Sequence, residues 1–184
     1  ISVNVYNVGE DVTYKIGAYK SGAFNNSATA ELTVLSDAEL ALYNQTNSTD
    51  YKAIPATCYT IDGSKLAFSK EEKNAYITIN FKPESILSIP DYKTSNYVLP
   101  IQLSDASVTI NEDKKYSFIK PNVLEPTIYL AKTGFSNTVI EDDGEATIEL
   151  DLPLALDFEN KWDINCSLQA NQDLLDNYNT AQGT

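Results

Sequence analysis

Alternation of apolar and polar residues marks the strands that we expect in this chain. Successive side chains of a strand point to opposite faces, so this alternation lets one face be buried. The pattern is clearest at residues 75–81, where Ala75, Ile77, Ile79 and Phe81 share a face. The same period predicts strands at residues 12–18, 30–34 and 97–103. Further short strands are expected at residues 57–61, 65–68, 108–110 and 116–119, on either side of turns, and Ile128 and Leu130 close the unit.

A short helix is expected after the strand at residues 30–34. Ser36 and Glu39 have the spacing of a capping box, in which the serine caps the helix and the glutamate bonds back to the serine backbone. Leu40 and Tyr43 follow three residues apart, on one face of the helix. The polar run at residues 44–49 ends this helix.

Turn residues between the strands suggest how they pair. Asp62-Gly63 separates two apolar segments and predicts a hairpin. The charged run at residues 111–115 predicts a second hairpin, between residues 108–110 and 116–119. Pro100 lies inside an otherwise regular strand and lacks a backbone donor, so we expect a bulge or a sheet edge there.

Seven or eight short strands, one helix and frequent turns are typical of an all-β fold. We predict an immunoglobulin-like β-sandwich with one short helix, and a β-barrel is the structural alternative.

A repeat indicates that the chain holds more than one copy of this fold. The pattern of residues 30–49, a short strand followed by a capped helix and Tyr43-Asn44, returns at residues 164–184 with Tyr178-Asn179. Upstream, residues 12–16 resemble residues 146–150. We therefore expect an immunoglobulin-like domain at residues 1–130 and a truncated second copy at residues 131–184.

The charge balance argues against one class of partner. The chain has 26 acidic and 13 basic residues, a formal net charge of −13, and every basic residue is lysine. Without arginine there is no bidentate phosphate clamp, and the net charge repels phosphate, so nucleic acid is not an expected partner. No apolar run approaches the roughly 20 residues that span a bilayer.

Catalytic and metal-binding chemistry is not expected. The absence of histidine removes histidine-dependent nucleophilic schemes and histidine metal sites. The acidic run at residues 141–145 lacks the spaced ligands of a calcium loop and reads as a turn. Cys58 and Cys166 occupy non-equivalent positions, so two buried free thiols are favoured over a disulfide. We expect no catalytic residue, metal site or cofactor.

Aromatic residues supply the candidates for binding. Tyr51 and Tyr92 lie in expected loops, where a ring with a polar tip can stack on a sugar, although core packing is the plainer role for any one tyrosine. Trp162 could serve as a sugar platform too, but it shares a face with Ile164, Cys166 and Leu168, which favours the core.

Much of the first unit resembles a known family. It is similar to a domain of unknown function in surface lipoproteins of gut bacteria, which also precedes some chitinase-like endo-β-N-acetylglucosaminidases. The residues that carry the resemblance are DYKAIP at 50–55, AYITINF at 75–81, PDYKTSNYVLPIQL at 90–103, SDAS at 104–107 and INED at 110–113. The spaced acidic signature of the chitinase-like enzymes is absent.

The resemblance implies a non-catalytic surface protein of a polysaccharide-utilisation system. Such a protein would bind glycans or a surface protein, or act as a spacer for a binding module. It would be exported to the cell surface or outer membrane and would meet the membrane only through a lipid anchor outside this chain. The alternatives are an accessory N-terminal domain of a glycoside hydrolase, whose catalytic domain is not in this chain, and an adhesin-type structural role.

Overall fold

The computed structural model describes residues 1–22, 26–131, 152–158 and 165–183. It divides into two units, Ile1–Thr127 and Ile128–Thr184, and each is described here by itself. The predicted boundary lay three residues later, after Leu130. Trp162 and the acidic run at residues 141–145 lie outside the described residues.

The larger sheet of the first unit has the strand order β1-β9-β8-β3-β6, with β4 paired to the start of β8. Its strands are β1 (Ser2–Tyr6), β3 (Ala28–Val34), β4 (Lys52–Ala53), β6 (Lys65–Phe68), β8 (Tyr97–Ser104) and β9 (Tyr116–Leu124). The β1–β9 and β4–β8 pairs are parallel, and the other pairs are antiparallel.

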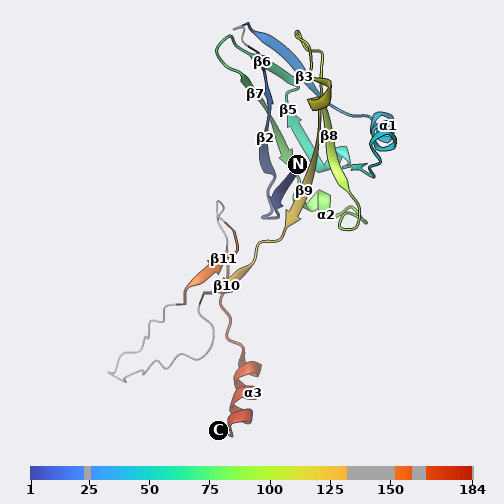
Figure 1. Ribbon diagram of the computed structural model, residues 1–184. Coiled ribbons are helices and arrows are strands. Elements are labelled where there is room, and N and C mark those ends of the chain that lie inside the picture. Colours follow the sequence, from blue (N-terminus) through green and yellow to red (C-terminus); the bar gives the residue numbers. More distant parts are fainter. Residues whose placement is uncertain (23–25, 132–151, 159–164, 184) are drawn as a thin grey trace. The chain divides into compact units, whose positions relative to one another are not determined.

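The smaller sheet packs against the larger one, and the two form a sandwich (Figure 1). It consists of β2 (Val12–Tyr19), β7 (Asn74–Phe81) and β5 (Tyr59–Asp62), all antiparallel, with β7 in the middle. The all-β immunoglobulin-like sandwich predicted for the first unit is therefore confirmed.

The core lies between the two sheets and is built from the alternating positions. Ile79 and Phe81 of β7 face Leu99 of β8 and Ile119 of β9 across the sandwich, and all four are fully buried. Each such side chain contributes about 1.5–3 kcal/mol by leaving water.

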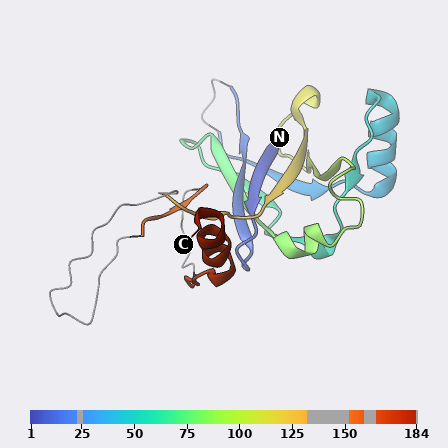
Figure 2. The ribbon, with the colours of Figure 1, turned by 90° about the horizontal axis from the view of Figure 1, so that it is seen from below.

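Helix α1 (Asp37–Asn47) begins with the predicted capping box. The Ser36 hydroxyl accepts a bond from the Glu39 backbone, and the Glu39 carboxylate accepts one from the Ser36 N–H. Leu35, Leu40 and Val98 are buried outside the main core cluster. The helix lies on the far side of the larger sheet from β2 and β7 (Figure 1 and Figure 2).

Both predicted hairpins are wrong. The segments on either side of Asp62-Gly63 are β5 and β6, but β5 pairs with β7 and β6 with β3. The turn, with Gly63 at a φ of 80°, therefore passes the chain from one sheet to the other. Residues 108–110 form no strand, and β9 pairs with β8 instead.

Pro100 lies in the middle of the larger sheet, so the expectation of an edge or bulge there is also wrong. The register from Leu99 to Gln102 against β9 is continuous. On its other side, β8 pairs with β4 up to Val98 and with β3 from Ile101 onward. Pro100 stands where the partner changes, so its missing donor costs no ladder hydrogen bond, and its carbonyl accepts from the Leu35 N–H at 3.0 Å.

The remaining short elements connect the strands. They are the 3-10 turns η1 (Ala56–Cys58) and η2 (Glu112–Lys114) and the helix α2 (Pro83–Leu87). In the second unit, β10 (Ile128–Leu130) pairs with β11 (Leu154–Leu156), and α3 (Gln172–Gln182) follows. Helices α1 and α3 both have 11 residues and carry Tyr-Asn at the same place. Residues 146–150 lie outside the described residues, and the second copy stays a prediction.

Candidate functional site

Four aromatic rings gather on the outer face of the larger sheet, beside α1. Tyr51 stacks on Phe118 with ring centroids 4.9 Å apart and an interplanar angle of 21°. Tyr43 lies 4.4 Å from Phe118 and 5.4 Å from Tyr116. We call Tyr43, Tyr51, Tyr116 and Phe118 the aromatic cluster.

The alternation of side chains along β9 explains the position of two of these rings. Ile119 is fully buried on the core side of β9, so Tyr116 and Phe118 of the same strand point outward. Tyr43 comes from α1, one turn after the buried Leu40. Tyr51 comes from the segment between α1 and β4.

The end of α1 fixes Tyr51 through Asn44. Ser48 ends the helix in a left-handed conformation, with a φ of 54°, and turns the chain back toward the sheet. The Asn44 amide then donates to the Tyr51 carbonyl at 2.8 Å, and its oxygen accepts from the Tyr51 N–H at 3.2 Å. The Thr49 hydroxyl donates to the same oxygen at 2.7 Å.

A chain of polar side chains borders the Tyr51 end of the cluster. The Asn96 amide donates to the Asp50 carboxylate at 2.8 Å, and the Lys120 ammonium donates to the Asn96 oxygen at 3.0 Å. Lys120 follows Phe118 on the outer face of β9. An amide, a carboxylate and an ammonium group therefore lie next to the stacked rings.

A second set of polar side chains borders the Tyr116 end. Gln102 donates to the Glu39 carboxylate at 3.3 Å, and Lys115 bonds to Glu112 at 2.6 Å. The Lys115 ammonium also lies 5.0 Å from the centre of the Tyr116 ring. The hydrogen bonds from Ser36, and a smaller one from Gln102, hold the pKa of Glu39 below its usual value.

An ionic network holds the loop that presents Asn96. Lys52 donates to the Asp91 carboxylate and to Ser95, and the Tyr97 hydroxyl donates to the other Asp91 oxygen at 2.7 Å. The hydrogen bond from Lys52, followed by those from Tyr97 and Ser95, holds the pKa of Asp91 well below its usual range. Both members of the Lys52–Asp91 pair are partly exposed, so its role is positional rather than strongly stabilising.

This arrangement suits the binding of a sugar. The rings offer apolar faces for the C–H groups of a pyranose, and the polar border offers donors and acceptors for its hydroxyls. Tyr116 is 37% exposed and the other three rings are half-buried, so the cluster is fixed by packing yet reaches solvent.

The two predicted sugar-binding tyrosines have different surroundings. Tyr51 is a member of the aromatic cluster. Tyr92 lies apart from it, and its hydroxyl donates to the Pro121 carbonyl at 2.6 Å and accepts from the Val123 N–H at 2.9 Å. Burial raises the pKa of the Tyr92 hydroxyl, which ties α2 and its following loop to β9. No binding measurement tests either residue, and both stay predictions.

Sequence reasoning missed the other three members of the cluster. The alternation that buries Ile119 also implies outward rings at Tyr116 and Phe118, so that signal was present. Tyr43 and Tyr51 approach β9 because of the way α1 packs on the sheet, and the local sequence pattern does not predict this packing.

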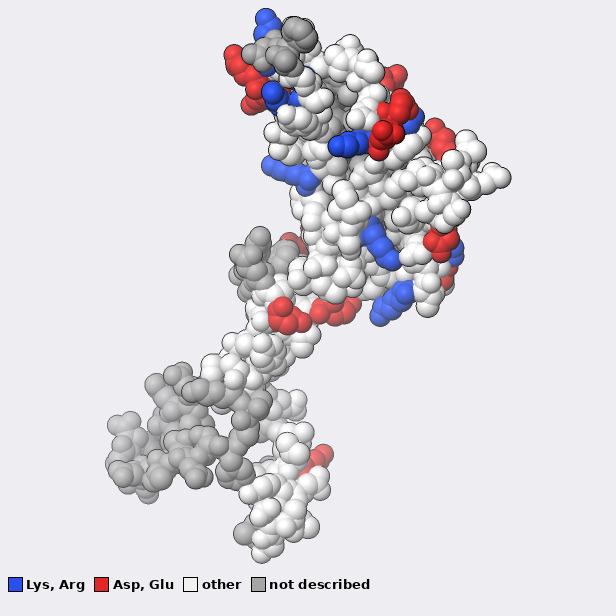
Figure 3. All heavy atoms as spheres, viewed as in Figure 1, with Lys and Arg blue, Asp and Glu red and all other residues white. Residues whose placement is uncertain are grey.

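Other kinds of site find little support in the described part of the chain. No group of three or more candidate metal ligands occurs there. None of the described helices combines the length and apolarity that crossing a membrane requires. Figure 3 shows acidic and basic side chains interspersed on the visible face of the first unit, unlike a single-sign binding surface.

Both cysteines are free thiols, as predicted. Cys58 is buried, and burial raises its pKa. Cys166 is exposed, so the prediction that it is buried is wrong. Its predicted partners on one face, Trp162 and Ile164, lie outside the described residues.

Several solved structures share this fold. A Bacteroides ovatus protein, provisionally described as carbohydrate binding, has a TM-score of 0.53 at 17% identity, over 70% of this chain and 36% of its own. A Bacteroides ovatus protein of unknown function has a TM-score of 0.52 at 13% identity, over 75% and 48%. The enzyme EndoBT-3987 of Bacteroides thetaiotaomicron, crystallised with a Man5GlcNAc product, has a TM-score of 0.51 at 22% identity, over 66% and 28%.

The chain thus spans less than half the length of each of these three proteins, and the likeness shows the fold alone. No curated protein matches the chain by sequence. Residues 1–110 match the model of a family described as a "-like, N-terminal domain". This match confirms the resemblance drawn from residues 50–113, and the chain belongs to this family of N-terminal domains.

Proposed function

We propose that the chain is a non-catalytic module of a polysaccharide-utilisation system, and that it captures glycans on the aromatic cluster. The observation that carries the proposal is the Tyr51–Phe118 stack with its polar border of Asp50, Asn96 and Lys120. The provisional description of one similar structure as carbohydrate binding supports the same class of ligand.

The geometry supports binding rather than cleavage at such a site. The nearby carboxylates of Glu39 and Asp50 accept hydrogen bonds from neighbouring side chains and hold them in place. Glycoside hydrolysis needs a general acid whose pKa is raised, whereas the pKa of Glu39 is lowered. Partly exposed rings and fixed polar groups suit recognition instead.

The cellular setting is part of the proposal. We place the protein at the cell surface or outer membrane after export, held by a lipid anchor outside this chain. There the domain would capture glycan for its own system, or space a further binding module away from the membrane.

The second candidate is an accessory N-terminal domain of a glycoside hydrolase. The family is one of N-terminal domains, and EndoBT-3987 contains this fold within a longer enzyme. The sequence that follows Thr184 in the source gene separates the two candidates. A (β/α)8 pattern with paired acidic residues favours the hydrolase, and a further sandwich favours the binding protein.

Calorimetric titration with a panel of oligosaccharides tests the capture of glycans. High-mannose chains come first, because the EndoBT-3987 complex contains Man5GlcNAc. We expect saturable binding that Tyr51→Ala weakens about tenfold, or ~1.4 kcal/mol. Tyr76→Ala is the matched control, since Tyr76 is an exposed tyrosine on the smaller sheet.

Flat titrations across the panel with an intact fold would overturn glycan capture and leave only the spacer role. Equal weakening by Tyr51→Ala and Tyr76→Ala would show that glycan binds elsewhere.

A further inference from the structure

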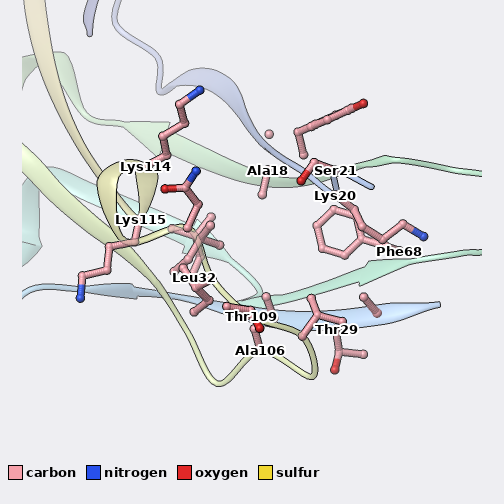
Figure 4. Close-up of a pocket in the computed structure, with 18 of the residues that line it drawn as sticks. Ala18, Lys20, Ser21, Thr29, Leu32, Phe68, Ala106, Thr109, Lys114 and Lys115 are labelled. Carbon is pink, nitrogen blue, oxygen red and sulfur yellow. The ribbon is translucent and has the colours of Figure 1, made fainter. Parts of the chain in front are cut away.

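A pocket of about 810 Å³ opens between β2 and the inner face of the larger sheet (Figure 4). Its walls are mainly apolar, with Ile16 and Ala18 on β2, Leu32 on β3, and Ile101 and Leu103 on β8. Pockets that hold small organic ligands have this size and are mostly apolar with a few polar groups. The space continues the core toward solvent at one end of the sandwich.

The charged residues around this pocket are all basic. Lys20, Lys114 and Lys115 line it, and none of the described lining residues is an aspartate or glutamate. The whole chain has twice as many acidic as basic residues, so a pocket lined only by basic charged residues differs from the chain's overall composition. Basic side chains in the wall favour an anionic over a cationic ligand group.

Two of these lysines have no carboxylate partner among the described residues. Lys115 pairs with Glu112, whereas neither Lys20 nor Lys114 forms an ion pair with a described acid. Lys20 donates to the backbone carbonyls of Asn26 and Ser69, the latter at 2.6 Å, which fixes its position and leaves its charge uncompensated. Lys114 is free to turn toward a ligand.

The pocket also exposes a large apolar side chain. Val108 is 50% exposed and lines the pocket. This position would lose water contact if an apolar molecule filled the space.

We propose that this pocket binds a small amphiphile with an apolar body and a carboxylate head. The body fills the space between β2 and β8, and the carboxylate lies near Lys114. The inference is independent of glycan binding, although the pocket shares Tyr116 and Lys115 with the neighbourhood of the aromatic cluster, so its tests avoid those two residues.

Titration of the full chain with decanoate and with decanol tests the proposal, because the two probes share an apolar body and differ in the charge of the head. We expect saturable binding of decanoate at one site, about three- to tenfold tighter than decanol at low salt. The difference should shrink as the salt concentration rises.

Two substitutions test whether the ligand binds in this pocket. Lys114→Gln should weaken decanoate about threefold and leave decanol unchanged, whereas Lys93→Gln, at an exposed lysine outside the pocket, should change neither. Ala18→Leu fills the pocket and should abolish binding of both probes.

The following results would overturn the proposal. Neither probe binds although the fold is intact; decanol binds as tightly as decanoate; or Ala18→Leu, still folded, binds both probes as the unaltered chain does. None of these outcomes affects the glycan titration, so the two proposals fail separately.

Discussion

The side-chain amide of Asn44 holds the backbone of Tyr51 from both sides, at 2.8 Å to its carbonyl and 3.2 Å to its N–H. The end of α1 thereby sets the height of the Tyr51 ring above Phe118. The stack is thus a property of the helix end as much as of the ring itself.

Removal of the Asn44 side-chain amide should weaken glycan binding without removing any ring. We expect Asn44→Ala to reduce affinity several-fold and to lower the free energy of unfolding by about 1–2 kcal/mol, because two backbone hydrogen bonds are lost. Gln45→Ala is the control, at an exposed neighbour in the same helix. Calorimetry and urea unfolding check both effects. Unchanged affinity in Asn44→Ala would show that the hydrogen bonds from Asn44 to the Tyr51 backbone do not shape the site.

The capping box should contribute measurably to stability. Ser36→Ala removes the acceptor for the Glu39 N–H at 3.3 Å and should lower the free energy of unfolding by about 1 kcal/mol. Asp37→Ala, next in the chain, tests whether the effect belongs to the cap alone. Equal unfolding midpoints for Ser36→Ala and the unaltered chain would contradict the assignment.

The Asp91 network predicts how stability depends on pH. The folded-state pKa of Asp91 is lowered from 3.8, so its stabilising effect is present above that value and is lost as the pH falls toward the folded-state pKa. The stability difference between the unaltered chain and Asp91→Asn should therefore be largest near neutral pH and shrink below about pH 4. Urea unfolding across this range checks it, and a difference that does not change with pH would refute the network's role.

Tyr92 should act on stability rather than on glycan binding. Its hydroxyl joins two backbone groups of β9, at 2.6 Å and 2.9 Å. Tyr92→Phe should therefore cost about 1–2 kcal/mol of unfolding free energy and leave the glycan titrations unchanged. Loss of glycan affinity in Tyr92→Phe with normal stability would instead return Tyr92 to the candidate site.

The two thiols should differ sharply in reactivity. Cys58 is buried and its pKa is raised by burial, whereas Cys166 is exposed. A thiol reagent near neutral pH should label one cysteine quickly in the native protein and the second only on unfolding. Mass spectrometry of the labelled peptides should place the fast site at Cys166, and fast labelling at Cys58 would contradict the packing of the first unit.

Local pattern was sufficient for the elements that bury one face. Ile77, Ile79 and Phe81 mark β7 because each reaches the core, and Ser36 with Glu39 marks the start of α1. The residues that make up each signal lie within a few positions of one another, so neither signal requires knowledge of how the strands pair.

Pairing across the fold could not be predicted in the same way. The Asp62-Gly63 turn has hairpin chemistry, yet β5 and β6 enter different sheets, because their apolar faces meet across the core. The short strand β1 went unrecognised because it pairs in parallel with β9, Ser2 opposite Lys120, more than 100 residues away. The aromatic cluster has the same origin, since its rings come from α1, β9 and the segment between α1 and β4.

The most direct test of the glycan site is a chemical-shift map of the isotopically labelled chain titrated with a high-mannose oligosaccharide. The account predicts that the largest perturbations fall on Tyr51, Phe118 and the side-chain amide of Asn96, with little change across β2, β5 and β7. Perturbations centred on the smaller sheet, with the Tyr51 and Phe118 signals unmoved at saturation, would contradict it.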